Sequence, residues 1–110
     1  MATTTYKVLA QSAPSATSNT DIYTVGAGKQ TVVSTIVICN RANTAASYRI
    51  AIRPDGAVLA NTHYIAYDVP INANDSTTLT LGITIDAADV VTVYASNANL
   101  TVSIFGAEIA

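Results

Sequence analysis

Apolar residues in this chain recur in short runs with a period of two, and turn-forming residues interrupt the runs roughly every 8–12 positions. Alternation of this kind places successive side chains on opposite faces of a β-strand. The clearest run, residues 77–85, alternates leucines and isoleucines with threonines and a glycine. No segment of helical length shows a 3.6-residue period. The pattern therefore predicts an all-β protein.

The spacing of the runs predicts about eight strands, joined by turns rich in Gly, Pro, Asn and Asp. This number and spacing favour an antiparallel β-sandwich, and a single sequence does not separate a jelly-roll from an immunoglobulin-like topology. Residues 57–61 fit either a helical turn or a strand. The expected strands are residues 5–9, 21–25, 30–40, 47–53, 63–69, 77–85, 90–95 and 100–106.

A chain of 110 residues is expected to form a single domain. Residues 1–20 are predicted to be an N-terminal strand and an extended arm or loop, and residues 21–110 the sandwich. The small, polar residues of the arm fit a segment that lies across a neighbouring subunit or on its own sandwich. The longest run, residues 30–40, is apolar on both faces, which predicts a central strand with one face partly covered. Strict alternation there opposes Val33, Thr35, Val37 and Cys39 to Val32, Ser34, Ile36 and Ile38.

Charge is scarce, since 50% of the residues are hydrophobic, 11% are charged, and the formal net charge is −2. Nucleic-acid binding is not expected, because it requires clustered basic residues. No apolar run approaches the ~20 residues that span a bilayer, so no membrane contact is expected. The first residues lack the leader pattern of a secretory signal, which predicts synthesis in a cytoplasm. A surface with so little charge repels its neighbours weakly and favours an oligomer or a larger assembly.

The residues needed for catalysis do not occur together in this sequence. Nucleophilic catalysis requires a nucleophile, a base and an orienting group, and His63 is the only imidazole. We interpret it as a partly exposed structural histidine. The single Cys39 excludes an internal disulfide and fits a buried small apolar residue. One His and one Cys do not make a closed zinc site, and the acids fall mostly at turns, where they bond backbone amides. No enzyme activity, metal or cofactor is expected.

Four residues are candidates for contacts with another subunit. Arg49 and Arg53 face outward from the expected strand 47–53, where they either make charge-assisted contacts across an interface or are solvated. Tyr64 and Tyr67 fit core packing or a subunit contact. A sugar-binding platform is the competing interpretation, but their odd separation predicts that the two rings face opposite sides of the strand.

Five segments resemble small virion proteins of tailed bacteriophages, those of cyanobacterial phages in particular. The segments are residues 3–12 (TTTYKVLAQS), 22–25 (IYTV), 33–41 (VSTIVICNR), 48–53 (YRIAIR) and 63–68 (HYIAYD). The resemblance implies a β-sandwich that forms homo-oligomers on the particle, as head decoration, in the neck or tail, or as a fibre adaptor. It implies no particular functional residues.

Residues and resemblance together predict a structural accessory protein of a phage virion that decorates or stabilises the capsid, neck or tail. Its expected partners are copies of itself, as a trimer or hexamer, and virion proteins such as the major capsid or tail proteins. It would be made in the cytoplasm of the host bacterium. The alternative function is a carbohydrate-binding, host-attachment module of a tail fibre or baseplate.

Overall fold

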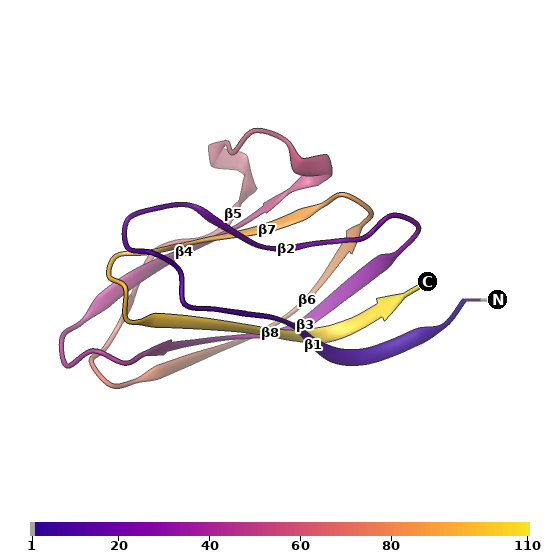
Figure 1. The fold of residues 1–110 in the computed structure, drawn as a ribbon. Coiled ribbons are helices and arrows are strands. Elements are labelled where there is room, and N and C mark those ends of the chain that lie inside the picture. Colours follow the sequence, from indigo (N-terminus) through magenta and orange to yellow (C-terminus); the bar gives the residue numbers. More distant parts are fainter. Residues whose placement is uncertain (1) are drawn as a thin grey trace.

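The computed structural model describes residues 2–110 and shows two four-stranded antiparallel sheets packed face to face (Figure 1). The expected all-β antiparallel sandwich is therefore confirmed. Two short 3-10 helices, η1 (Pro54–Gly56) and η2 (Asn61–His63), follow the fourth strand. The strands are β1 (Thr4–Ser12), β2 (Thr20–Thr24), β3 (Gln30–Asn40), β4 (Ala46–Arg53), β5 (Tyr64–Ile71), β6 (Ser76–Asp86), β7 (Val90–Ala95) and β8 (Leu100–Ile109).

The order of the strands identifies the topology that the sequence left open. Sheet A has the order β1-β8-β3-β6 and sheet B the order β2-β7-β4-β5. Strand 1 thus pairs with 8, 2 with 7, 3 with 6 and 4 with 5, as if one long antiparallel hairpin were wound into two sheets. This is the jelly roll, in which the closing strand pairs lie far apart in sequence.

Most strand bounds lie close to the expected ones, and two differences have clear causes. β8 continues to Ile109, because the apolar tail pairs with both β1 and β3. β5 continues through Pro70, which is tolerated because β5 is the outermost strand of sheet B. In the ambiguous segment, residues 57–60 have no regular structure and the short helix η2 follows.

The core lies between the inner faces of the two sheets. β-Branched residues fill such pleated surfaces well, and fully burying one aliphatic side chain contributes about 1.5–3 kcal/mol. Sheet A contributes mainly from β3 and β8, and sheet B from β4 and β7. The buried residues of these four strands in the core are Val33, Ile36, Ile38, Leu100, Val102 and Ile104 from sheet A, and Tyr48, Ile50, Val91, Val93 and Ala95 from sheet B.

A β-bulge at Ser34 corrects the facing that strict alternation predicted for β3. The register with β8 runs Val33 to Gly106 and then Thr35 to Phe105, so Ser34 is an extra residue on β3. Val33 therefore shares the inner face with Ile36 instead of opposing it. Beyond the bulge, the outward positions of β3 include Thr35, Val37 and Cys39. β3 is central in sheet A, as expected.

Residues 13–19 join β1 of sheet A to β2 of sheet B along the end of β7. Pro14 is buried, Ala16 forms a parallel bridge with Ala95, and the Thr17 amide donates to the Ala95 carbonyl at 2.8 Å. Met1, the first residue of the expected arm, lies outside the described residues. Across residues 2–110, no helix has the length and apolar character needed to cross a bilayer.

β3 and β8 approach each other so closely at the bulge that position 106 has room only for glycine. A β-carbon at this position would overlap the backbone carbonyl oxygen of Val32. We expect Gly106→Ala to lower the free energy of unfolding by about 3 kcal/mol, because backbone atoms must move to make room. Gly26→Ala is the control, since its added carbon meets only ordinary contacts with the Lys29 side chain. Urea unfolding measures both, and equal stability of the two variants would contradict the close approach.

Candidate interaction surfaces

The outward face of sheet A carries almost no charge. Its positions follow from the strand registers, because they alternate with the core residues. Threonines and half-exposed apolar side chains dominate, and the one Asp, Glu, Lys or Arg among the outward positions described is Asp86, at the end of β6. These positions are Thr4, Tyr6, Val8 and Gln11 on β1, Thr101, Ser103, Phe105, Ala107 and Ile109 on β8, Val32, Thr35, Val37 and Cys39 on β3, and Thr78, Thr80, Thr84 and Asp86 on β6.

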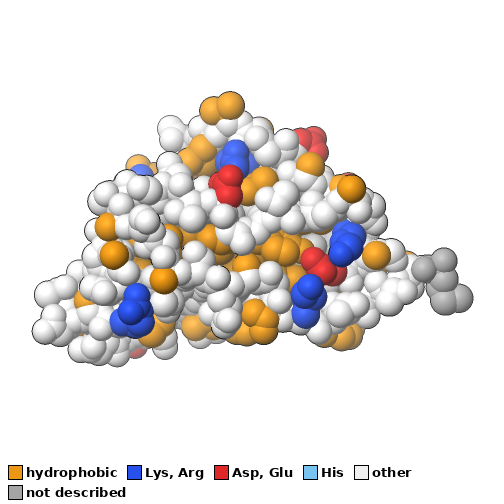
Figure 2. Space-filling view, in the orientation of Figure 1, with side chains coloured by type: hydrophobic (Ala, Val, Ile, Leu, Met, Phe, Trp, Pro, Cys, Tyr) orange, Lys and Arg blue, Asp and Glu red, His pale blue; other side chains and the backbone are white. Residues whose placement is uncertain are grey.

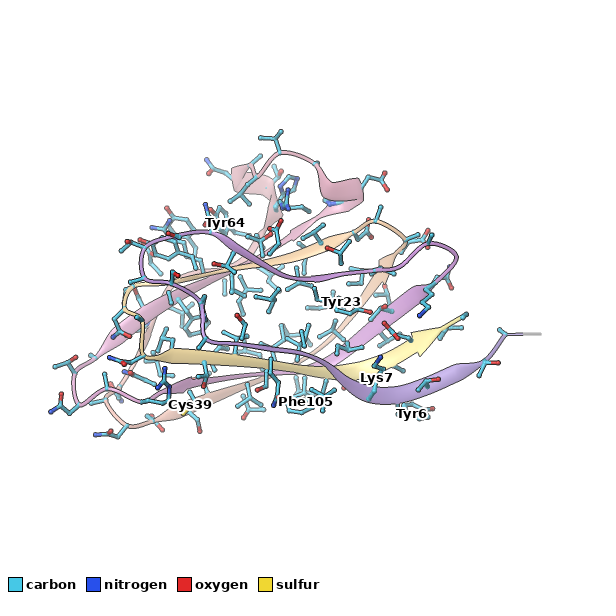
Figure 3. All side chains as sticks on the ribbon, in the orientation of Figure 1. Tyr6, Lys7, Tyr23, Cys39, Tyr64 and Phe105 are labelled. Atoms are coloured by element: carbon cyan, nitrogen blue, oxygen red, sulfur yellow. The ribbon has the colours of Figure 1, made fainter. Side chains whose placement is uncertain are left out.

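Part of this face is hollowed. Tyr6 is 84% exposed, and Figure 3 shows Tyr6, Phe105 and Cys39 on the side of sheet A that faces away from sheet B. Cys39 is half-buried on this outward face, which corrects its expected place in the core. The hollow has a volume of about 620 Å³ and is lined by Thr4, Tyr6, Lys7, Val32, Ser34, Phe105, Gly106, Ala107 and Ile109.

The outward face of sheet B, in contrast, carries charged and aromatic side chains that bind one another. The Arg49 guanidinium lies 4.3 Å from the centre of the Tyr67 ring and 4.2 Å from that of Tyr94. It also donates two hydrogen bonds to Asp68, at 2.6 and 3.3 Å. The bonds to Asp68 raise the pKa of Arg49 above its already high value. Cation–π and bidentate contacts of this kind hold a guanidinium in one orientation.

Arg53 is held in a second cluster on the same face. Its Nε donates to the Thr92 hydroxyl at 3.0 Å, and its Nη2 donates to Asp21 at 2.8 Å. Its Nη1 reaches the carbonyls of Gly56 and Ala57 after β4. The Thr92 hydroxyl in turn donates to Asp21, which closes a ring of contacts over the buried Thr92. Both arginines face outward as the sequence indicated, and each is bound within its own chain.

Tyr64 and Tyr67 lie next to each other on the outer side of sheet B. The prediction that the two rings face opposite sides of the strand was therefore wrong. Their ring centres are 4.8 Å apart with an interplanar angle of 84°. The reason is the irregular register of β5, which shifts twice against β4 around Ala66 and so breaks the strict alternation. Asn61 joins the two rings in lining a hollow of about 390 Å³.

A third cluster closes one end of the sandwich, where the space-filling view shows an acidic group between two basic ones (Figure 2). Glu108 on β8 accepts a hydrogen bond of 2.6 Å from the Tyr23 hydroxyl on β2 and lies 3.2 Å from Lys7 and 3.9 Å from Lys29. Tyr23 also contacts Thr31 at 2.9 Å. The cluster thus ties β2 of sheet B to β1, β3 and β8 of sheet A.

The pKa values in this cluster follow from burial and from these bonds. Burial and the carboxylate of Glu108 raise the pKa of Tyr23 to about 12. The hydrogen bond from Tyr23 lowers the pKa of Glu108, and Lys7 and Lys29 lower it further. At neutral pH the pair is therefore a protonated phenol donating to a carboxylate, which is a strong hydrogen bond.

His63 and the acids at the turns are held by hydrogen bonds within their loops. His63 accepts a hydrogen bond at Nδ1 from the Ala60 amide at 3.1 Å, within η2. Asp89 accepts from the amides of Asp55 and Asp86, and Asp75 accepts from that of Ser76. Within residues 2–110, no three His, Cys, Asp or Glu side chains gather as a metal site.

Comparison with known proteins gives a likeness in structure alone. No protein-family model and no curated protein matches the sequence. A chain from a structure of infectious bursal disease virus, Gt strain, superposes on 98% of this chain with a TM-score of 0.50 and 8% identity. A chain from the Gx strain covers 99% with a TM-score of 0.47 and 10% identity. This chain spans 31% of the length of either neighbour. At such identity the likeness concerns the fold.

The cluster at Glu108 predicts a pH dependence of stability. A carboxyl whose pKa is lowered in the folded state stabilises the fold above its unfolded pKa of about 4.3, and that contribution is lost as the pH falls through the folded value. We expect Glu108→Gln to reduce stability at pH 7 by roughly 1 kcal/mol and to flatten the acid limb below pH ~5. Urea unfolding from pH 7 to 2.5 measures this. Asp75→Asn, in an exposed turn, is the control, and an unchanged acid limb in Glu108→Gln would contradict the assignment.

Proposed function

We propose that this protein is a structural accessory component of a phage virion, which adheres to its neighbours and stabilises the capsid, neck or tail. The observation that carries the proposal is the contrast between the two outward faces. On the outward face of sheet B, the charged side chains are bound to one another. The outward face of sheet A instead presents threonines and half-exposed apolar residues over four long strands. Antiparallel sheets usually present a polar face to solvent, and central strands that are apolar on both faces are typical of sheets covered on both sides.

Internal ion pairing supports the same function. Four of the five Lys and Arg residues lie within 4 Å of a carboxylate of their own chain, and the fifth, Arg41, donates to the Ala98 carbonyl. Most of the positive charge is thus neutralised within the chain and adds little to the field around the molecule. The fold likeness to a chain from a virus structure agrees with a role in a particle. A homo-oligomer, trimeric or hexameric, that contacts capsid or tail proteins suits such a surface.

Carbohydrate binding in host attachment is the second candidate, favoured by the meeting of Tyr64 and Tyr67. Two aromatic rings nearly at a right angle, with Asn61 lining the same hollow, offer a sugar ring an apolar surface next to a polar residue. This candidate ranks second because Arg49 already covers the Tyr67 ring at 4.3 Å.

The virion function predicts that the protein is a stoichiometric part of the particle. Mass spectrometry of gradient-purified particles from the infected host is expected to find this chain at a copy number that is a multiple of the local symmetry. Particles made without it are expected to lose integrity at lower temperature, because subunit contacts are missing. The complete absence of the chain from purified particles would rule the virion role out.

The glycan-binding candidate predicts a signal on a glycan array that depends on Tyr64. Tyr64→Ala removes one wall of the hollow and is expected to abolish the signal while the fold, followed by circular dichroism, stays intact. Tyr6→Ala is the matched control, since Tyr6 is an exposed tyrosine on the opposite sheet. A signal that survives Tyr64→Ala would dismiss this site, and no signal from the wild-type protein would dismiss the candidate.

A further inference from the structure

We infer that the outward face of sheet A binds the same face of a second copy of this chain, about a two-fold axis. The inference rests on the proposed function, because it names the partner and one surface of the self-assembly proposed there. Of the two assemblies, a two-fold contact fits the hexamer, in which it joins two trimers, and does not by itself build a trimer. The starting point of the inference is the pair of central strands. β3 and β8 bury one face in the core and carry a second set of apolar side chains outward, namely Val32, Val37, Phe105, Ala107 and Ile109.

The size of the face fits a stable dimer. Four strands of sheet A at about 4.8 Å spacing, each about 30 Å long, cover roughly 600 Å² of flat area. Side chains make the accessible surface larger than this projection, so the face approaches the roughly 800 Å² per partner of a standard interface. The face is therefore large enough to support dimerisation without help from the rest of the molecule.

The lack of charge selects a second copy as the partner. In a two-fold contact each surface meets itself, so any charge near the axis is placed close to its own like charge. The outward positions of sheet A largely avoid this conflict, because Asp86, at the end of β6, is the one Asp, Glu, Lys or Arg among those described. Lys7, which lines the hollow, is paired with Glu108 of its own chain at 3.2 Å. A charged partner would find only the carboxylate of Asp86 to pair with at these positions. A copy also supplies a pleated sheet of the same spacing, and aligned sheets pack about 10 Å apart with interdigitating side chains.

The outward face of sheet A has a hollow and, next to it, the projecting side chain of Tyr6. Tyr6 is 84% exposed and projects beside the hollow of about 620 Å³ that Phe105 and Val32 help to line. An isologous contact brings a projection of each copy to the surface of the other. Tyrosine is well suited to this position, because its ring buries a large apolar area and its hydroxyl retains a hydrogen bond.

Two matched variants test the inference. Thr35 lies outward at the middle of sheet A, and Thr24 lies outward and exposed on β2 of sheet B. Thr35→Arg places an unpaired charge in the proposed contact and is expected to weaken self-association about 100-fold or more, whereas Thr24→Arg leaves it unchanged. Light scattering over a concentration series measures both. Thr80→Arg, at an exposed position paired with Thr35, replaces Thr35→Arg if circular dichroism shows that the latter does not fold.

The native thiol gives an independent readout in the wild-type protein. Cys39 is the single cysteine and lies half-exposed on the outward face of sheet A. Its reaction with a thiol reagent is expected to slow at least tenfold when the protein is concentrated past the association midpoint. Thr35→Arg is expected to remove this concentration dependence.

The outcomes separate this contact from the function it serves. Association that resists both arginine variants on sheet A, or a Cys39 reaction that ignores concentration, overturns the inference. So does a protein that stays monomeric at every concentration. The content of purified particles decides the virion role separately. If the chain is present in virions but assembles through another surface, the proposed function stands and the proposed contact through sheet A is wrong.

Discussion

The packing of the two inner faces is the interaction on which the rest of this structure depends. Isoleucine, leucine and valine from β3 and β8 meet those from β4 and β7 in one layer between the sheets. Burial of this layer decides which residues of each strand face inward, and pleating then assigns their neighbours to the outside. The nearly uncharged face of sheet A and the charged face of sheet B are therefore both consequences of how the core is filled.

Local sequence patterns were enough to predict where the strands lie. They were not enough to predict which face of the sheet each side chain occupies near a bulge. The bounds of β3 and β7 were predicted correctly, because period-two alternation and turn residues are properties of neighbouring positions. The bulge at Ser34 depends on the register between β3 and β8, which come together only in the fold. The same limit explains the error at Tyr64 and Tyr67, where β5 slips against β4. Strand order was open for a similar reason, since pairing of β1 with β8 joins the two ends of the chain.

The candidate residues were located better than their partners. Arg49 and Arg53 were predicted to face outward, and they do, because they alternate with the inward-facing Tyr48, Ile50 and Ile52. Their carboxylate partners, Asp68 and Asp21, lie 19 and 32 residues away, and no local signal indicates such pairs. The cluster at Glu108 was missed for the same reason. Glu108 lies in the apolar tail, 85 residues from Tyr23.

The few positive charges of this chain influence its surroundings even less than their number suggests, because most of them are paired. The cations Lys7, Lys29, Arg49 and Arg53 all lie against carboxylates of their own chain. Exposed ion pairs of this kind add little to stability, about 0–1 kcal/mol each, but they cancel the field that the charges would project. The paired cations therefore contribute little to the interaction between copies, and in the proposed contact shape and apolar area matter more than charge. An outward sheet face with as little charge as that of sheet A suits the proposed adhesion to identical neighbours.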